Sequence, residues 1–181
     1  YPEIIKQLPS NQQPEIHTGD MDIISQSIDY LGINFYTRQV YKAHPSDVYD
    51  PLAPQGPLTD MGWEIYPQSF TDLLVTLNNT YTLPPIYITE NGAAMPDTIK
   101  NGEVNDVDRV NYYHSHLNAV HDATAQGVNI IGYFAWSLMD NFEWAEGYLK
   151  RFGIVYVDYK TQQRTIKASG QAYKSLIQSR K

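Results

Sequence analysis

Acidic and aromatic side chains stand at the ends of short apolar runs in this sequence. Glu90 follows the run Ile86–Thr89, and Tyr36 closes the run Tyr30–Tyr36. The segment IYITENGAAM around Glu90 contains no Lys or Arg, which weakens the explanation that this carboxylate only forms a surface ion pair. A carboxylate at the end of a rigid strand can act as a base or a nucleophile, and a nearby tyrosine hydroxyl can hold it ionised and aimed.

A third group of such residues lies in WSLMDNFEW, residues 136–144, where Trp136 and Trp144 flank Glu143. An indole face can stack on a sugar ring, and a carboxylate can bind two hydroxyls. Two interpretations of this segment fit the sequence: its aromatic side chains pack in the core, or they bind a sugar. Glycoside hydrolysis with retention needs two carboxylates about 5–5.5 Å apart, one ionised and one protonated. Glu90 is the candidate for the ionised member.

Three strands and three helices are expected to position these groups. The runs Tyr30–Tyr36, Ile86–Thr89 and Ile130–Trp136 are apolar throughout, which predicts parallel strands covered on both faces. Apolar residues at helical spacing predict helices at roughly 68–78, from 107 to just before Gly127 with Asp106 as N-cap, and at roughly 167–178. The segments 37–67 and 137–165 are long enough to be functional loops.

Strand, long loop and helix, repeated three times, predict an α/β fold with a parallel sheet or a barrel. In a (β/α)₈ TIM barrel the chemistry lies on the loops that leave the C-terminal ends of the strands, where Glu90 would stand. A doubly wound sheet stays open as an alternative, although the sequence after Asn91 does not form the GxGxxG phosphate turn.

Composition narrows the classes of partner. The net charge of −7 and the lack of a Lys/Arg block argue against nucleic acid and against an anionic membrane surface. No cysteine is present, and the five histidines lack metal-ligand spacing, so we expect no metal and no cofactor. The N-terminus has neither a basic start nor an apolar core of a signal peptide, and we expect a cytoplasmic location.

Three segments carry a family resemblance: LGINFYT (31–37), PIYITENG (85–92) and GYFAWSLMDNFEWAEGYLKRFGIVYVD (132–158). They strongly resemble β-glucosidases of glycoside hydrolase family 1, over essentially the whole chain. The resemblance implies that Glu90 is the nucleophile and Tyr36 its hydrogen-bonding partner. It also implies a set of substrate-binding residues: Trp136 as the −1 platform, Glu143 on O4 and O6, Trp144 on the O3 side, Phe152 in the same pocket, Asn34 near the nucleophile, and Trp63 on the aglycone side.

The substrate implied by this resemblance is a β-glucoside or cello-oligosaccharide. Glucose, galactose and fucose stay open, because the angle of Glu143 at O4 decides the epimer. Phospho-glycosidases of the family replace this carboxylate with serine and add a lysine and a tyrosine. Here Glu143 and Phe152 stand at two of these places and only Lys150 remains, which favours an unphosphorylated sugar.

The sequence also departs from the family pattern. The family's acid/base glutamate lies in an Asn-Glu-Pro segment that is absent here. We therefore expect residues 1–181 to be the C-terminal portion of a single TIM-barrel domain, its last three βα units. Such a portion would be stable only with the N-terminal part or a second copy, and inactive alone. The alternatives are a non-catalytic half-barrel that binds sugar or only assembles, and, more weakly, a barrel isomerase with Glu90 as base.

Overall fold

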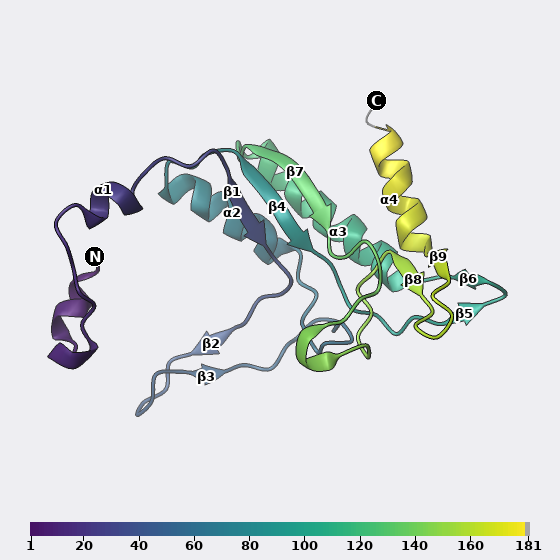
Figure 1. The fold of residues 1–181 in the computed structure, drawn as a ribbon, viewed down its shortest axis with the longest axis horizontal. Helices are drawn as coiled ribbons and strands as arrows, with labels where there is room; N and C mark the ends of the chain where they lie inside the picture. Colours follow the sequence, from purple (N-terminus) through teal and green to yellow (C-terminus); the bar gives the residue numbers. More distant parts are fainter. Residues whose placement is uncertain (180–181) are drawn as a thin grey trace.

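A computed structural model describes residues 1–179, and a three-stranded parallel sheet lies at its centre (Figure 1). The strands are β1 (Leu31–Asn34), β4 (Ile86–Asn91) and β7 (Ile130–Ala135), with β4 in the middle. The long helices are α2 (Gln68–Thr80), α3 (Val107–Ala125) and α4 (Ala168–Ser179), one after each strand. The three predicted βα units are confirmed, and each predicted strand or helix lies within two residues of its observed bounds.

Shorter elements fill the connections. The loop after β1 contains the hairpin β2 (Tyr41–Lys42) and β3 (Asp50–Pro51), and the loop after β4 contains β5 (Ile99–Lys100) and β6 (Glu103–Val104). The loop after β7 contains η3 (Trp144–Glu146), β8 (Val155–Val157) and β9 (Arg164–Ile166). Before β1 come η1 (Glu3–Gln7), η2 (Ser10–Gln12) and α1 (Asp20–Ile24), which extend away from the sheet in Figure 1.

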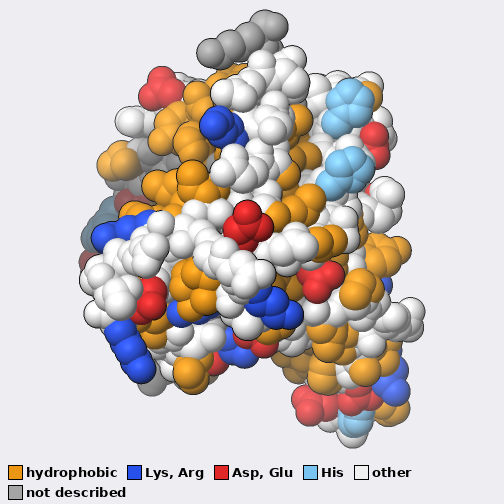
Figure 2. Space-filling model, turned by 90° about the vertical axis from the view of Figure 1, so that its right-hand side faces the viewer, with side chains coloured by type: hydrophobic (Ala, Val, Ile, Leu, Met, Phe, Trp, Pro, Cys, Tyr) orange, Lys and Arg blue, Asp and Glu red, His pale blue; other side chains and the backbone are white. Residues whose placement is uncertain are grey.

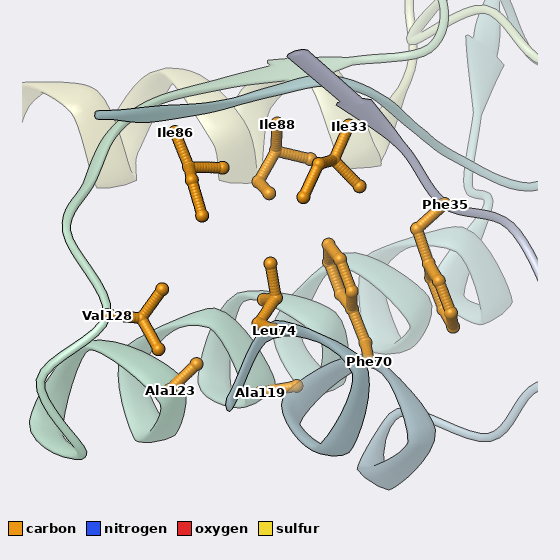
Figure 3. Packing of buried hydrophobic residues seen from close by; sticks show 9 residues of the cluster. All are labelled: Ile33, Phe35, Phe70, Leu74, Ile86, Ile88, Ala119, Ala123 and Val128. Atoms are coloured by element: carbon orange, nitrogen blue, oxygen red, sulfur yellow. The ribbon is translucent and has the colours of Figure 1, made fainter. Parts of the chain in front are cut away.

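The main core lies between the sheet and the helices α2 and α3. Alternate residues of β4, Ile86 and Ile88, are almost completely buried because their side chains point toward these helices. Figure 3 shows them facing Leu74 of α2 and Ala123 of α3 across the layer. Burying such aliphatic side chains contributes about 1.5–3 kcal/mol each. The packing of β4 against α2 and α3 therefore fixes the position of the C-terminal end of β4.

The opposite face of the sheet is open, so the prediction that both faces are covered was wrong for the described residues. Tyr30 and Phe134 are 54% and 56% exposed, and both rings contact Tyr87. The reason is geometric. In a closed barrel this face would look onto the other strands, and three strands cannot enclose an interior. β1 and β7 each pair along one edge only within residues 1–179.

The buried face of α3 also differs from the predicted apolar stripe. Val107 is half exposed, whereas Arg109, Tyr112 and His116 are fully or almost fully buried. Polar side chains can occupy this face because most of their polar atoms find partners inside the protein. Asp106 does precede the helix, but its carboxylate makes no capping bond and binds Arg109 and Ser169 instead.

Two surface properties bear on partners. None of the helices within residues 1–179 combines the length and the apolar character needed to cross a membrane. On the face shown in Figure 2, acidic and basic side chains are interspersed among hydrophobic ones and do not gather into regions of one sign.

Candidate active site

Glu90 lies at the C-terminal end of β4, and its carboxylate accepts a hydrogen bond from the Tyr36 hydroxyl. The distance between Tyr36 Oη and Glu90 Oε2 is 2.6 Å. Tyr36 lies two residues beyond β1, and the register between β1 and β4 shifts at Asn34, which pairs with Glu90. Burial first, and then the hydrogen bond to Glu90, raise the pKa of Tyr36, so the phenol stays protonated and donates. The predicted hydrogen bond is thus present.

A cavity of about 430 Å³ opens beside this pair. Its lining comes from the three strand ends and their loops, and consists of Tyr36, Met61, Trp63, Glu90, Trp136, Glu143, Trp144, Ala145, Glu146 and Phe152. A volume of this size lies within the range of small-molecule sites. The cavity brings together all the residues singled out from the sequence except Asn34. Met61, Ala145 and Glu146 are additional: Ala145 and Glu146 lie in the segment 132–158 that carries the family resemblance, but none of the three was singled out from the sequence.

Asn34 takes a different place. It is exposed on the open face of the sheet, where its Oδ1 accepts a hydrogen bond of 2.6 Å from Thr89 Oγ1 on the neighbouring strand. This contact ties the end of β1 to the residue that precedes Glu90. In the described part of the chain Asn34 does not line the cavity.

The inner wall of the cavity is aromatic. The ring of Tyr36 lies edge-on to Trp63 at 5.4 Å and to Phe152 at 6.1 Å, measured between ring centroids. Phe152 is 2% exposed, so it supports the wall from behind, whereas Trp144 is 81% exposed at the rim. Such a wall offers flat faces to the C–H groups of a ligand, and the carboxylates of Glu90, Glu143 and Glu146 offer acceptors for its hydroxyls.

Glu143 shares the cavity with Glu90. Its burial raises its pKa, the indole of Trp136 opposes this by hydrogen bonding, and the negative charge of Glu90 adds to the rise. The backbone around Glu143 is closed by a short turn, in which Glu143 N donates to Gly147 O at 2.7 Å. Gly147 has a φ of +58°, in the region that favours glycine.

Asn91 anchors the backbone next to Glu90, and the sequence reasoning did not single it out. Its side chain is fully buried. Nδ2 donates to Phe35 O at 2.7 Å and to the Tyr112 hydroxyl at 3.0 Å, and Oδ1 accepts from the Tyr133 hydroxyl at 2.6 Å. One amide therefore joins all three strands and α3 immediately beside Glu90. An amide within an apolar strand was the available signal, because a buried polar group requires partners.

Gly92 allows Trp136 to approach the end of β4. A Cβ atom at position 92 would lie 1.8 Å from the carbonyl oxygen of Trp136. Trp136 N donates to Asn91 O at 2.8 Å, and the Tyr113 hydroxyl donates to Trp136 O at 3.1 Å. The peptide between Trp136 and Ser137 is cis. The two hydrogen bonds hold the backbone of Trp136 against the strand that carries Glu90.

Two further observations concern charges around the cavity. The Lys150 ammonium is already engaged, since it lies 3.3 Å from the Asp60 carboxylate and 2.5 Å from the Asp60 carbonyl oxygen. Among the described residues, no group of three or more His, Asp or Glu side chains is arranged to hold a metal ion.

Consecutive βα units, with a carboxylate at a strand end beside an aromatic cavity, are typical of proteins of the (β/α)₈-barrel class. Comparison with known proteins agrees. The family model for glycosyl hydrolase family 1 matches residues 1–181, and the chain belongs to that family.

Three relatives illustrate the match. The chain is 45% identical to a β-glucosidase of Agrobacterium sp., over 97% of this chain and 40% of the relative. It is 44% identical to a bifunctional β-D-glucosidase/β-D-fucosidase of Bifidobacterium breve, over 88% and 39%. A solved structure of a Thermotoga maritima β-glucosidase in complex with glucoimidazole superposes with a TM-score of 0.91 at 42% identity, covering 98% of this chain and 41% of that one. The chain thus spans about 40% of the length of these relatives.

Proposed function

We propose that this chain supplies the nucleophile side of a retaining β-glucosidase, with Glu90 attacking the anomeric carbon. The observation that carries the proposal is the 2.6 Å hydrogen bond from Tyr36 to Glu90 at the wall of a cavity that also contains Glu143 and three tryptophans. A carboxylate that accepts a hydrogen bond from a phenol is aimed by that contact and is suited to act as a nucleophile.

The reaction would proceed in two steps. Glu90 forms a bond to the anomeric carbon as the bond to the leaving oxygen breaks, and an acid/base glutamate outside this chain protonates that oxygen. Water, deprotonated by the same glutamate, then cleaves the glycosyl-enzyme and restores Glu90. Residues 1–181 would be the C-terminal portion of a single TIM-barrel domain acting in the cytoplasm. The remaining strands would come from the N-terminal part or from a second copy of the chain.

The substrate would be a terminal β-D-glucosyl residue of an aryl glucoside or a cello-oligosaccharide. Glu143 would hold O4 and O6, Trp136 would stack on the ring, Trp144 would lie on the O3 side, and Trp63 on the aglycone side. An unphosphorylated sugar is favoured, because Glu143 would repel a phosphate and Lys150 is engaged by Asp60. Hydrolysis of β-fucosides fits the proposal as well, since one relative is bifunctional.

A mechanism-based label tests the proposal. The complete barrel is incubated with a 2-deoxy-2-fluoro-glucoside that carries a good leaving group, and the protein is digested and analysed by mass spectrometry. We expect one label per active site, attached to Glu90. Labelling of another carboxylate, or no labelling of a fully assembled barrel, would exclude Glu90 as nucleophile.

A non-catalytic half-barrel is the second candidate, and the open sheet with two unpaired edges favours it for the isolated chain. Two assays on purified 1–181 test this second candidate. Turnover of an aryl β-glucoside and binding of glucose by calorimetry are both measured. We expect no turnover without the remaining strands. Measurable turnover would show that the acid/base group outside this chain is dispensable.

A further inference from the structure

A network of six charged side chains lies beside the cavity, and the proposed reaction does not use it. Three carboxylates face three cations in it: Asp97, Asp106 and Asp140 with Arg109, Arg151 and Lys167. The side chains of Arg109, Lys167 and Asp140 are fully buried. Buried ion pairs do little for net stability, since desolvation offsets their attraction, but they can define a geometry strictly.

Asp140, in the loop after β7, binds two of the three cations of this network, Lys167 and Arg151. Its Oδ1 accepts from Lys167 Nζ at 2.8 Å and from Gly153 N at 3.0 Å. Its Oδ2 accepts from Arg151 Nη1 at 2.5 Å and from Val157 N at 3.3 Å. The Asp140 carboxylate, near the start of the segment 137–157, therefore binds Arg151, Gly153 and Val157 at the end of the same segment.

The segment closed in this way carries Glu143, Trp144 and Phe152, all of which line the cavity. Asp140 lies three residues before Glu143, and no hydrogen bond between the two side chains is present in the described structure. The influence of Asp140 on Glu143 must therefore pass through the shape of the backbone.

The same network reaches the loop that follows Glu90. Lys167 Nζ donates to Asp97 Oδ2 at 2.5 Å as well as to Asp140, and Asp97 pairs with Arg109 at 2.8 Å. Arg109 Nε in turn donates to Ala93 O at 3.0 Å, three residues after Glu90. The loop after β4, which follows Glu90, and the loop after β7, which carries Glu143, are thus joined through Lys167.

We propose that Asp140, with Lys167 as its counter-ion, is a positioning residue that sets the place of Glu143 relative to Glu90 and thereby controls recognition of the sugar at O4 and O6. The inference rests on the proposed function, in which Glu143 binds these hydroxyls. Neutralising Asp140 leaves two cations without their shared partner and releases the segment that carries Glu143. Recognition that depends on Glu143 is lost, while chemistry at Glu90 is retained.

The test compares two substrates in the complete enzyme. An aryl β-glucoside has the C6 hydroxymethyl group that Glu143 would bind, and the matching aryl β-xyloside lacks it. A displacement of about 1 Å can cost about 10²-fold in rate, so we expect Asp140→Asn to lower kcat/KM for the glucoside by about that factor. The kcat/KM for the xyloside should fall far less, so that kcat/KM for the glucoside divided by that for the xyloside decreases strongly. An equal fall for both substrates, or an unchanged ratio, overturns the inference.

Controls separate positioning from a loss of stability. Thr71→Val removes a buried hydrogen bond of 3.0 Å between Thr71 Oγ1 and Ala119 O, far from the cavity, and should lower Tm without changing the ratio. If Asp140→Asn does not fold, Arg151→Lys replaces it, because Arg151 is the partly exposed member of the network. A folded Arg151→Lys enzyme whose glucoside-to-xyloside ratio of kcat/KM equals that of the unmodified enzyme also overturns the inference. An unmodified enzyme that is neither active nor labelled at Glu90 refutes the proposed function instead.

Discussion

The Tyr36 hydroxyl lies 2.6 Å from Oε2 of Glu90, although 54 positions separate the two residues in the sequence. The contact exists because β1 and β4 are parallel neighbours whose C-terminal ends lie together. In the described structure this phenol is the side chain that donates a hydrogen bond to the Glu90 carboxylate.

Replacement of Tyr36 by Phe should therefore slow formation of the glycosyl-enzyme. A hydrogen bond to a charged group contributes about 1.5–3 kcal/mol, which corresponds to about a 10- to 100-fold loss in kcat/KM. The rate of labelling by the fluoroglucoside measures this step. Tyr49→Phe, in the exposed loop between β2 and β3, is the matched control and should leave the rate unchanged. An unaffected Tyr36→Phe enzyme would show that the hydrogen bond has no role in the attack.

Asn91→Ala should both destabilise the protein and impair activity. The variant leaves the Tyr133 hydroxyl and the Phe35 carbonyl without their partner, at a cost of about 1–3 kcal/mol for each buried group left unsatisfied. Urea unfolding of the complete protein measures the loss. Asn79→Ala, on the exposed side of α2, serves for comparison and should change the unfolding free energy little. A loss no larger than that of Asn79→Ala would contradict the anchoring role of Asn91.

Gly92→Ala should disturb Trp136 more than it disturbs the core. The added methyl group would overlap the Trp136 carbonyl oxygen, so the backbone must shift, at a cost of about 1–3 kcal/mol. We expect a lower Tm and a change in the quenching of tryptophan fluorescence by glucose. Gly102→Ala, at a hairpin turn where an added Cβ meets no atom within 4 Å, is the comparison: its φ of +81° should lower Tm, and the quenching should stay unchanged. Unchanged quenching in a folded Gly92→Ala protein would contradict this expectation.

His116 should make stability fall in mild acid. It is fully buried against Tyr112, and its Nε2 has no hydrogen-bond partner among the described residues. Burial lowers the pKa of His116 to about 4, from an ordinary value near 6.5. The unfolded chain thus takes up a proton first, and the unfolding free energy decreases as the pH falls from about 6.5 to 4, by at most about 3 kcal/mol.

The measurement is the unfolding free energy of the parent and of His116→Phe at several values of pH. Phe keeps an aromatic ring but does not titrate, so the difference between the two proteins isolates the histidine. We expect the parent to lose more stability than the variant between pH 6.5 and pH 4, and the two to run parallel above pH 7. Parallel curves throughout would show that His116 is not kept neutral by the fold.

Periodic and apolar signals in the sequence predicted the elements well. The runs ending at Tyr36, Thr89 and Trp136 became the three strands, because β-branched and aromatic residues favour this geometry and the helices between them supply a core. The likeness to a known family selected most of the cavity residues. The expected burial of both sheet faces failed, because a local pattern does not reveal what lies opposite a strand.

Contacts between distant polar residues could not be predicted in this way. Asp97, Arg109, Asp140 and Lys167 are separated by long stretches of sequence, and each alone resembles an ordinary surface charge. Only the folded arrangement removes them from water and pairs them. The hydrogen bond between Asn34 and Thr89 was also not predicted, although the alternation of side chains along β1 places Asn34 on the exposed face of the sheet.

The two outer strands of the sheet have a consequence for kinetics. β1 and β7 each leave one row of backbone groups unpaired within the described chain, and these groups require a complementary strand. If that strand belongs to the same polypeptide, closure is a first-order process and dilution does not matter. If it belongs to another molecule, the fraction of closed barrels depends on concentration by mass action. The order of the refolding reaction would then distinguish an intramolecular barrel from an assembled one.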